Sequence, residues 1–293
     1  MKIAVVGARG QLGAAVVDQF TADHEVVPLT HEELDVTVDD DVAAAMSRLR
    51  PHVIINCAAM NDVDGAEDRP IEALNANAFA VRALARAALD LDATLVHFST
   101  DFVFDGTAST PYTETDSPNP LSAYAMSKLL GEWFAEDAAN VFVLRVESLF
   151  GRAAGGRPAK GSVAGILKAL LAGDELRVFE DRTISPTYIM DAAWATRRLL
   201  DMQAPYGMYH CVNSGQATWL ELAKELARQL GVAGRIVPVR LKDMALRAER
   251  PVFCALSNEK LARLGIVMPS WQDALGRYLL TARDDFAHQL SNR

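Results

Sequence analysis

The stretch Val5–Val17, VVGARGQLGAAVV, decides how the first part of this chain folds. It continues a short apolar run, Lys2–Val6, and its glycines recur every three residues, at Gly7, Gly10 and Gly13. Glycine lets the chain turn tightly, leaves room for a pyrophosphate, and allows the next helix to pack closely on a sheet. The first N–H groups of that helix would face the phosphates. The stretch therefore predicts a strand, a phosphate-binding turn and a helix.

This pattern continues through the first 146 residues, where short β-branched runs alternate with longer amphipathic stretches. Such alternation is typical of a parallel sheet with crossover helices. We expect strands at Lys2–Val6, Glu25–Leu29, Val53–Asn56, Thr94–Phe98 and Val141–Val146. We expect helices at Gln11–Ala22, Asp39–Leu49, Ile71–Asp90 and Ser122–Ala138, the third with Leu74, Phe79, Val81 and Leu84 on its apolar side. The predicted fold class is α/β, a doubly wound parallel sheet of the Rossmann type.

The pattern is less regular after Val146 and begins with a loop, GRAAGGRPAKGS at Gly151–Ser162. Its glycines, proline and cationic residues suggest either mobility or a lid that faces a ligand. Further helices are expected at Val163–Ala172, Asp191–Met202, Thr218–Leu230 and Trp271–Thr281, and strands at Leu176–Phe179, Gly207–Val212 and Ile236–Val239. We predict a dinucleotide-binding domain over residues 1–146. Residues 147–293 would form mainly a smaller α/β substrate lobe, with about 185–212 returning to the first domain.

Composition excludes several classes of protein. The chain has 293 residues, half of them apolar, so a sizeable core is available. Its 29 Lys and Arg against 38 Asp and Glu give a net charge of -9, which argues against nucleic acid or an anionic membrane as partner. Because no apolar run is long enough to be a signal peptide or to span a membrane, we expect a cytoplasmic protein.

The three cysteines, Cys57, Cys211 and Cys254, lie far apart and lack CxxC spacing. This arrangement favours reduced, mostly buried thiols over a disulfide framework or a zinc site. We therefore predict no metal.

The end of the second strand, in VVPLTHEELDV, bears on the choice of cofactor. An NAD-preferring site would usually present an acidic residue there to the ribose hydroxyls, but this chain has Thr30 or His31. A 2′-phosphate is then not repelled, and Arg9 in the glycine turn could bind it. We expect NADPH, with NADH possible because Glu32 and Glu33 lie close by.

The segment SAYAMSK, Ser122–Lys128, places Tyr124 and Lys128 four residues apart, on one face of a predicted helix. A phenol with a reference pKa of about 10 is a poor acid–base group at neutral pH. An adjacent ammonium and a cationic nicotinamide would stabilise its phenolate. Tyr124 could then give a proton to a carbonyl oxygen as a hydride arrives at carbon. The alternative is a surface tyrosine beside a solvated lysine.

A second segment, VHFSTDFVFDG, favours the catalytic interpretation. Ser99, Thr100 and Asp101 fall just past the carboxyl end of a predicted strand, where ligands bind in open α/β sheets. A hydroxyl there can hydrogen-bond the same carbonyl oxygen. Chemistry alone does not rank Ser99 against Thr100, because strand alternation sends them to opposite faces.

Together these motifs resemble the dTDP-4-dehydrorhamnose reductase family, nucleotide-sugar reductases of the extended short-chain dehydrogenase/reductase type. The resemblance covers nearly the whole chain. It is carried by GARGQLG, RPHVIINCAAMNDVDGAE, LNA at Leu74–Ala76, HFSTDFVFDG, YAMSK, SPT at Ser185–Thr187, YHCVNSGQATW at Tyr209–Trp219, and RPVFCALSNEKLARLGI from Arg250. It implies hydride transfer from NADPH or NADH to the 4-keto group of a nucleotide-activated 6-deoxy sugar, with dTDP-4-dehydrorhamnose as the expected substrate.

The resemblance also implies roles for single residues. Thr100 would be the catalytic hydroxyl, Tyr124 the proton donor, and Lys128 would orient the nicotinamide ribose. Positions that line the cofactor match Gly7, Gly10, Gln11, Leu12, Gly13, Asp35, Val36, Ala58, Ala59 and Asn75. Val63 and Phe102 match positions near the sugar. A core role is the alternative for Val36, Ala58, Ala59 and Val63. Candidates for a diphosphate clamp are Arg152, Arg157, Lys160, Arg247 and Arg250, of which Arg250 heads the matching RP segment.

The chain departs from the family pattern in its substrate half. Arg145-Val146-Glu147-Ser148 stands where relatives commonly read Arg-Thr-Ser-Trp, so we expect Glu147 and Ser148 to contact a sugar. Ala15 replaces an acidic residue that binds Mg²⁺ at the dimer interface of some relatives. A monomer or weak homodimer is therefore expected. Two alternatives stay open: a reductase or epimerase of a different nucleotide sugar, and a non-catalytic NADP-binding subunit like the regulatory subunit of methionine adenosyltransferase.

Overall fold

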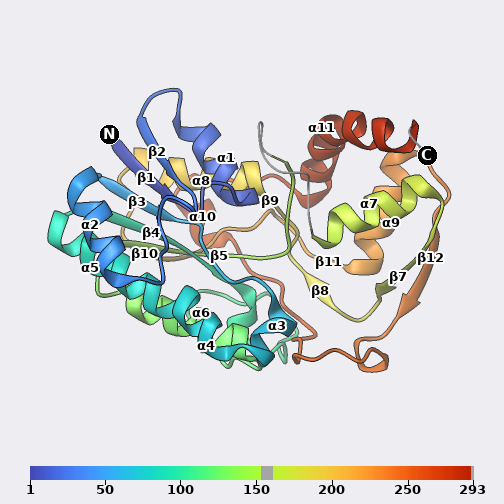
Figure 1. The fold of residues 1–293 in the computed structure, drawn as a ribbon. Coiled ribbons are helices and arrows are strands. Elements are labelled where there is room, and N and C mark those ends of the chain that lie inside the picture. Colours follow the sequence, from blue (N-terminus) through green and yellow to red (C-terminus); the bar gives the residue numbers. More distant parts are fainter. Residues whose placement is uncertain (153–160, 292–293) are drawn as a thin grey trace.

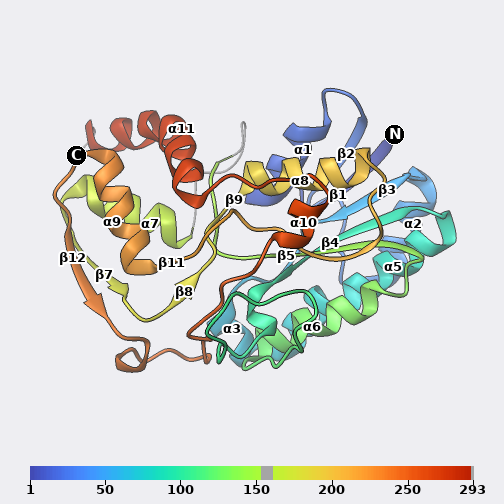
Figure 2. The same ribbon diagram turned by 180° about the vertical axis from the view of Figure 1, so that it is seen from behind.

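The computed structural model describes residues 1–152 and 161–291, with side chains as far as residue 282. Most of the loop predicted to be a lid, including Arg157 and Lys160, lies outside the described residues. Figures 1 and 2 show a layered α/β body that carries both a central sheet and, at one end, a group of helices and short strands from the second half of the chain.

The central sheet has six strands, all parallel to their neighbours. Their order across the sheet is β2 (Glu25–Leu29), β1 (Lys2–Val6), β3 (Val53–Asn56), β4 (Thr94–Thr100), β5 (Asn140–Val146) and β10 (Gly207–His210). The chain moves from β1 to β2 on one side and then to β3 on the other. This reversal between β1 and β3 is the switch point at which doubly wound sheets bind ligands. The predicted fold class is confirmed.

Strand alternation divides the core between the two faces of the sheet, because successive side chains of a strand point to opposite sides. Ile3 and Val5 belong to one buried cluster, and Ala4 and Val6 to another. The first cluster lies under α1 (Gln11–Phe20) and α8 (Ile189–Asp201), which pack on each other. The second lies under α2 (Asp39–Leu49), α5 (Ala80–Leu91) and α6 (Ala123–Ala135). The sheet is thus covered on both faces (Figure 1).

One predicted helix is wrong in detail. The stretch predicted as Ile71–Asp90 is observed as α4 (Pro70–Leu74), a π-helical turn η1 (Asn75–Phe79) and α5. A π turn adds a residue to the helical repeat and so rotates the face that follows. Val81 and Leu84 are buried as predicted, whereas Phe79 is 38% exposed and Leu74 only half-buried.

Short elements connect the sheet to the pocket. A helix α3 (Val63–Asp68) follows β3, and a 3₁₀ turn η2 (Asp101–Val103) follows β4. Later strands form three small pairs. Two are parallel: β6 (Leu149–Phe150) with β9 (Thr187–Tyr188), and β7 (Glu175–Phe179) with β12 (Arg235–Val239). The third is antiparallel and joins β8 (Thr183–Ile184) to β11 (Ala217–Thr218). The remaining elements are α7 (Ser162–Ala172), α9 (Trp219–Leu230), η3 (Leu241–Asp243), α10 (Glu259–Arg263) and α11 (Trp271–Ser291).

The second half of the chain contributes both to the central sheet and to the group of elements at its end. β10 pairs with β5, and α8 packs on α1, while α7, α9 and α11 lie together beside β7 and β12 (Figure 1). A division of the chain at residue 146 stays a prediction.

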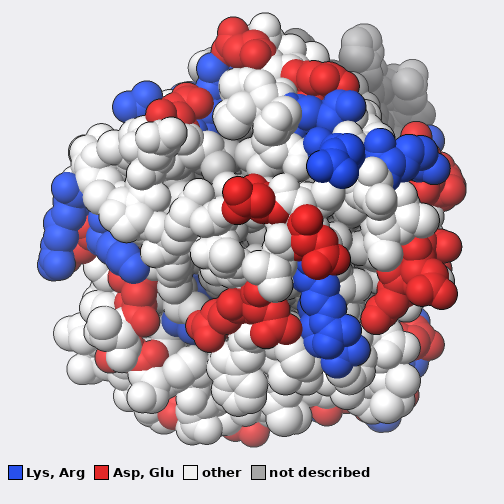
Figure 3. Space-filling view, turned by 90° about the vertical axis from the view of Figure 1, so that its left-hand side faces the viewer, with Lys and Arg blue, Asp and Glu red and all other residues white. Residues whose placement is uncertain are grey.

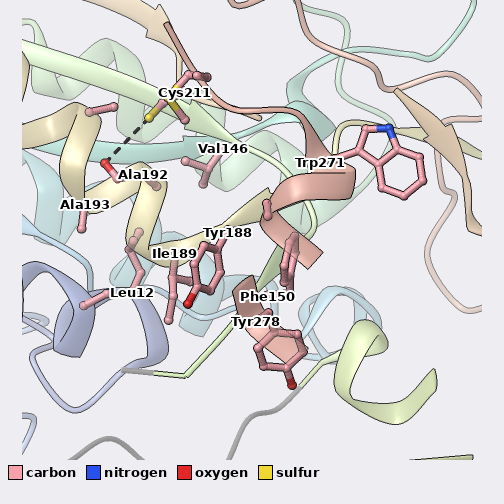
Figure 4. Packing of buried hydrophobic residues seen from close by; sticks show 14 of the residues in the cluster. Leu12, Val146, Phe150, Tyr188, Ile189, Ala192, Ala193, Cys211, Trp271 and Tyr278 are labelled. Atoms are coloured by element: carbon pink, nitrogen blue, oxygen red, sulfur yellow. Dashed lines mark hydrogen bonds between the residues drawn. The ribbon is translucent and has the colours of Figure 1, made fainter. Parts of the chain in front are cut away.

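One apolar cluster runs from the sheet into this end group, as Figure 4 shows. Leu12 of α1 belongs to the same cluster as an aromatic group in which the Phe150 ring stacks on Tyr188 at 5.5 Å and meets Tyr278 at 5.7 Å. Trp271, at the start of α11, is also buried in it. Because this core is continuous, it fixes where the second half sits relative to the glycine turn.

Charges are spread over the surface. On the face drawn in Figure 3, acidic and basic side chains are interspersed.

None of the helices that the structure describes is long and apolar enough to cross a membrane. The three cysteines are free, Cys57 half-buried and the other two buried.

Candidate active site

The glycine turn closes tightly at the switch point. Gly7 has a φ of 75°, in the left-handed region, and a Cβ there would come within 2.7 Å of the Ala58 nitrogen after β3. A Cβ on Gly13 would collide with the Gly7 carbonyl oxygen. α1 begins directly after Gly10 and has no side-chain cap, so its first N–H groups stay available. The turn therefore fits a dinucleotide phosphate, which helix N-termini bind.

A cavity of about 450 Å³ opens beside this turn. Twelve residues that the sequence assigned to cofactor, catalysis or sugar line it: Gly10, Gln11, Leu12, Ala58, Ala59, Val63, Thr100, Phe102, Tyr124, Lys128, Glu147 and Ser148, joined by Arg250. Other lining residues were missed, among them Cys57, Asn61, Arg182 and Trp219. The carboxyl ends of β1, β3, β4 and β5 thus meet at one cavity.

The structure places Thr100 next to Tyr124. β4 extends to Thr100, whose hydroxyl donates to Asp101 Oδ1 at 2.9 Å and accepts from the Phe102 N–H at 3.2 Å. Thr100 and Tyr124 line the same cavity, and the Thr100 side chain lowers the pKa of Tyr124 in part. Ser99 also lines the cavity, but its hydroxyl oxygen is buried without a partner. Of the two hydroxyls left open by the sequence, the geometry favours Thr100.

Burial controls the ionisation of Tyr124. The side chain is 7% exposed, and burial raises the pKa of Tyr124 well above its usual range, with the Thr100 side chain lowering it in part and the nearby Asp101 raising it. The Phe102 ring contacts it edge to face at 5.7 Å. Tyr124 is therefore a neutral phenol at pH 7, which can donate a proton.

Lys128 lies on the same helix as Tyr124 and is 3% exposed. Its ammonium donates to the Phe98 carbonyl of β4 at 2.6 Å. Burial lowers the pKa of Lys128 to about 8, against the opposing influence of Glu132 and Cys57. α6 is set by the Ser122 hydroxyl, which accepts from the Ala125 N–H at 3.2 Å as an N-cap. The cap explains why the motif begins with serine.

Several predicted cofactor residues do not line the cavity. Gly7 and Gly13 shape the turn behind it. Arg9 forms an ion pair with Glu32, both exposed. Asp35 accepts hydrogen bonds from the Thr37 N–H and hydroxyl, which hold the pKa of Asp35 below its usual value. Val36 is buried in the core on the α2 side, and Asn75 lies half-buried in the π turn.

Asn77, which was not predicted from the sequence, connects the loop after β3 to the helix α6 through hydrogen bonds. Its side chain accepts from the Met60 N–H at 2.8 Å, and donates to the Met60 carbonyl and the Ser127 hydroxyl at 3.0 Å each. Its carbonyl lies where a Cβ on Gly131 of α6 would be. The π turn thus brings Asn77 between the loop after β3 and the helix that carries Tyr124. Nothing in the sequence pattern separates Asn77 from its neighbour Asn75.

The substrate side of the cavity is built around Arg182, just before β8. Its guanidinium lies 5.0 Å from the Phe102 ring centre and donates to the Pro251 carbonyl at 3.3 Å. Arg250 lines the cavity too, and its guanidinium makes a bidentate pair with Asp64 of α3 at 2.7 and 2.8 Å. Arg247 is exposed and paired with Asp68. Of these arginines, Arg182 and Arg250 reach the cavity.

Glu147 and Ser148 follow β5 directly. Glu147 is 2% exposed and accepts from the Ser185 N–H at 2.6 Å. Burial raises the pKa of Glu147 well above its usual range, and the Asp101 carboxyl adds to the shift. Ser148 has a φ of 44°, so the chain turns sharply there before β6. Both residues line the cavity, but Glu147 faces the protein interior on most of its surface.

A doubly wound sheet with a glycine phosphate turn, a hydroxyl, a tyrosine and a lysine around one cavity defines a class of protein, the Rossmann-fold oxidoreductases. Within this class, the sequence model of the family described as RmlD substrate binding domain matches residues 1–283. The chain belongs to this family. The resemblance predicted from the sequence is confirmed.

Similar proteins cover nearly the whole chain. dTDP-4-dehydrorhamnose reductase of Burkholderia thailandensis is 35% identical over 94% of this chain and 97% of its own length. A protein of Streptomyces antibioticus, named a probable dTDP-4,6-dihydroxy-2-methyloxan-3-one 4-ketoreductase, is 34% identical over 94% and 93%. The crystal structure of dTDP-4-dehydrorhamnose reductase of Bacillus anthracis in complex with NADP superposes with a TM-score of 0.90, at 30% identity over 96% of this chain and 99% of that one.

Proposed function

We propose that this chain is an NADPH-dependent reductase of the 4-keto group of a nucleotide-activated 6-deoxy sugar, with dTDP-4-dehydrorhamnose as the first candidate. One observation carries the proposal: Thr100, Tyr124 and Lys128 line the same cavity as the phosphate-binding turn. Relatives of nearly the same length are named for this reaction, which supports the choice of sugar.

Each catalytic side chain has a separate task. When bound, NADPH supplies a hydride. Tyr124, a neutral phenol, gives its proton to the carbonyl oxygen of the sugar. Thr100, which lines the cavity with Tyr124, orients that oxygen. The Lys128 ammonium lies on the same helix, one turn on, and favours the phenolate that remains. The buried cavity strengthens these interactions, because charges in a low dielectric attract each other more strongly.

The cofactor preference rests on the end of β2 and the glycine turn. Thr30 there has a hydroxyl in place of a carboxylate, while the nearby Glu33 carboxylate accepts from the Thr30 N–H at 2.8 Å. A relative was solved with NADP, which supports NADPH. Arg9 is the cation that would bind the phosphate, once it leaves its exposed pair with Glu32. Exposed pairs of this kind contribute about 0–1 kcal/mol, so a phosphate can replace the carboxylate. A higher kcat/KM with NADH than with NADPH would contradict this preference.

A second candidate is a reductase of a different dTDP-linked keto sugar. Glu147 and Ser148 change the wall that the sugar would face, and one relative of similar identity is named as a ketoreductase of another dTDP sugar. The third possibility, a non-catalytic NADP-binding subunit, leaves the grouping of Thr100, Tyr124 and Lys128 without a purpose.

We also propose a cytoplasmic monomer or weak homodimer without nucleic-acid or membrane partners. The net charge of -9 supports this. Ala15, which matches a metal-binding acidic residue at the dimer interface of some relatives, is fully buried in α1 and has no oxygen side chain to offer a metal. Sedimentation at micromolar concentration, with and without Mg²⁺, tests it: a tight dimer that forms only with Mg²⁺ would be contrary to the proposal.

The function is tested with purified protein and a panel of 4-keto nucleotide sugars, by following the loss of NADPH absorbance and identifying the product by NMR. We expect turnover with dTDP-4-keto-6-deoxy sugars and the highest kcat/KM with dTDP-4-dehydrorhamnose. Highest activity with another keto sugar would select the second candidate. Cofactor binding without turnover of any sugar would contradict an enzymatic function and favour the non-catalytic NADP-binding subunit.

A further inference from the structure

A buried group of ionisable side chains lies behind the catalytic threonine. Asp101 follows β4, Glu147 follows β5, and Cys254 comes from the segment after η3. One ligand-type atom from each lies within 4.8 Å of the others, and all three side chains are buried. Arg182 is buried beside them and donates to the Cys254 sulfur at 3.8 Å. These four residues come from distant parts of the sequence and meet only in the fold.

Each carboxyl group has one bound oxygen and one without a partner. Asp101 Oδ1 accepts from the Thr100 hydroxyl at 2.9 Å, and Glu147 Oε2 accepts from the Ser185 N–H at 2.6 Å. Asp101 Oδ2 and Glu147 Oε1 are buried and have no hydrogen-bond partner. A buried polar atom without a partner is destabilising, and a proton on either carboxyl group lowers this penalty.

The charges around the pair lead to the same conclusion. Two ionised carboxylates against the single guanidinium of Arg182 would leave one uncompensated negative charge in the interior, which is costly. The other titratable groups that face the pair are the Cys254 thiol and the Tyr124 phenol, both neutral at pH 7. Burial raises the pKa of Asp101 to about 6, with Arg182 opposing it, and raises that of Glu147 further above its usual range.

We propose that Asp101 and Glu147 hold one proton between them at neutral pH, and that this shared proton sets the orientation of the Thr100 hydroxyl. Both are positioning residues that act through Thr100. The role in turnover rests on the proposed function, whereas the shared proton does not. Glu147, expected from the sequence to contact the sugar, acts in this arrangement from behind the site.

The orientation follows from the single hydroxyl proton of Thr100. An ionised Asp101 can only accept, so it takes the Thr100 proton and leaves nothing to donate to a substrate carbonyl. A protonated Asp101 donates to Thr100, whose own proton then points toward the carbonyl oxygen beside Tyr124. Glu147 makes this second state accessible, because like charges held close together cannot both ionise. Without the proton on Glu147 or Asp101, the second state is lost.

The shared proton is tested directly by infrared spectroscopy of the wild-type protein at pH 7, which separates the C=O stretch of a protonated carboxylic acid from that of carboxylates. We expect one protonated carboxyl band that disappears in Glu147→Gln and persists in Glu259→Gln, a matched change in an exposed ion pair. Neither result needs the sugar. No protonated band in the wild type, or a band unchanged in Glu147→Gln, overturns the proposal.

The role in turnover is tested by pH profiles. In Glu147→Gln, Asp101 loses its like-charged neighbour and stays ionised beside Arg182. We expect kcat at pH 7 to fall about 100-fold, the loss typical of one missing donor, to recover as the pH is lowered below 6, and KM to stay nearly constant. Asp101→Asn, which is permanently neutral, should keep most of kcat, and adding Glu147→Gln to it should change little.

Three results contradict this role. A Glu147→Gln variant that raises KM at unchanged kcat would make Glu147 a sugar contact. Equal losses from Glu147→Gln with and without Asp101→Asn would show that the two residues do not act together. Activity that is lost on chelation and restored by Zn²⁺ would assign Asp101, Glu147 and Cys254 to a metal. Thermal unfolding and NADPH binding of each variant check that it is folded.

Discussion

The two sides of the pocket are made of different contacts. On the cofactor side, Gly7 and Gly13 pack backbone against backbone, and no side chain fits between them. On the substrate side, Arg182, Asp101 and Glu147 are buried ionisable groups. Steric contacts therefore fix the cofactor side, which tolerates no added atom at these glycines. The substrate side would instead depend on the protonation that we propose for its carboxyl groups. Substitutions on the two sides should therefore fail in different ways.

Between the two sides lies Tyr124, whose loss should have the largest effect. We expect Tyr124→Phe to lower kcat about 1,000-fold, because Tyr124 is the proposed proton donor to the carbonyl oxygen. NADPH affinity should stay within about twofold. Steady-state kinetics and fluorescence titration measure the two quantities. Tyr206→Phe, at an exposed tyrosine, is the matched control and should keep full activity. Equal kcat values in the two variants would show that Tyr124 is not the proton donor.

On the cofactor side, a substitution that adds a side-chain atom should destabilise the fold through a steric clash. Gly13→Ala places a Cβ against the Gly7 carbonyl oxygen, so we expect a loss of about 3 kcal/mol in the free energy of unfolding together with weaker NADPH binding. Gly165→Ala in α7 is the control, because no atom lies within 4 Å of the added Cβ. It should raise stability by about 0.5–1 kcal/mol. Urea unfolding measures both, and similar losses in both variants would refute the close approach.

Lys128, which lines the cavity one helical turn after Tyr124, is tested by the pH dependence of turnover. Its pKa of about 8 is below the ordinary lysine value, so the ammonium is present below pH 8 and lost above it. We expect kcat/KM to fall about tenfold per pH unit above pH 8. Lys128→Arg, whose guanidinium stays charged, should shift this fall to higher pH. A wild-type profile that is flat up to pH 10 would show that the ammonium is not required.

The smallest effect is expected at the outer rim of the substrate side. Arg247 and Arg250 are three positions apart in the sequence and pair with Asp68 and Asp64 of the same helix. Arg250 lines the cavity, whereas Arg247 is exposed outside it. If Arg250 binds the diphosphate, Arg250→Ala should raise KM for the nucleotide sugar about tenfold, the value of one charge-assisted contact. Arg247→Ala should change KM less than twofold. Equal changes in KM would mean that neither arginine clamps the diphosphate.

Much of the fold could be predicted, because its signals are local. Strands β1, β2 and β3 match their predicted bounds, since their apolar residues are consecutive and lie between turn residues. Phe79 was misplaced because a π turn changes the helical repeat, and no composition rule marks where it occurs. Among the predicted site residues, Tyr124 and Lys128 line the cavity, whereas Asn75 of the LNA motif does not. Arg182, which lines the cavity, was not predicted.

The glycine turn, the hydroxyls at the end of β4 and the spacing of Tyr124 and Lys128 follow from the sequence, because each is encoded within a few neighbouring residues. The tertiary structure alone shows that Asn77 links the loop after β3 to α6, and that Arg182 is buried beside Asp101 and Glu147. The physical reason is distance along the chain: a buried charge is defined by its partners, and these come from strands that meet only when the sheet forms.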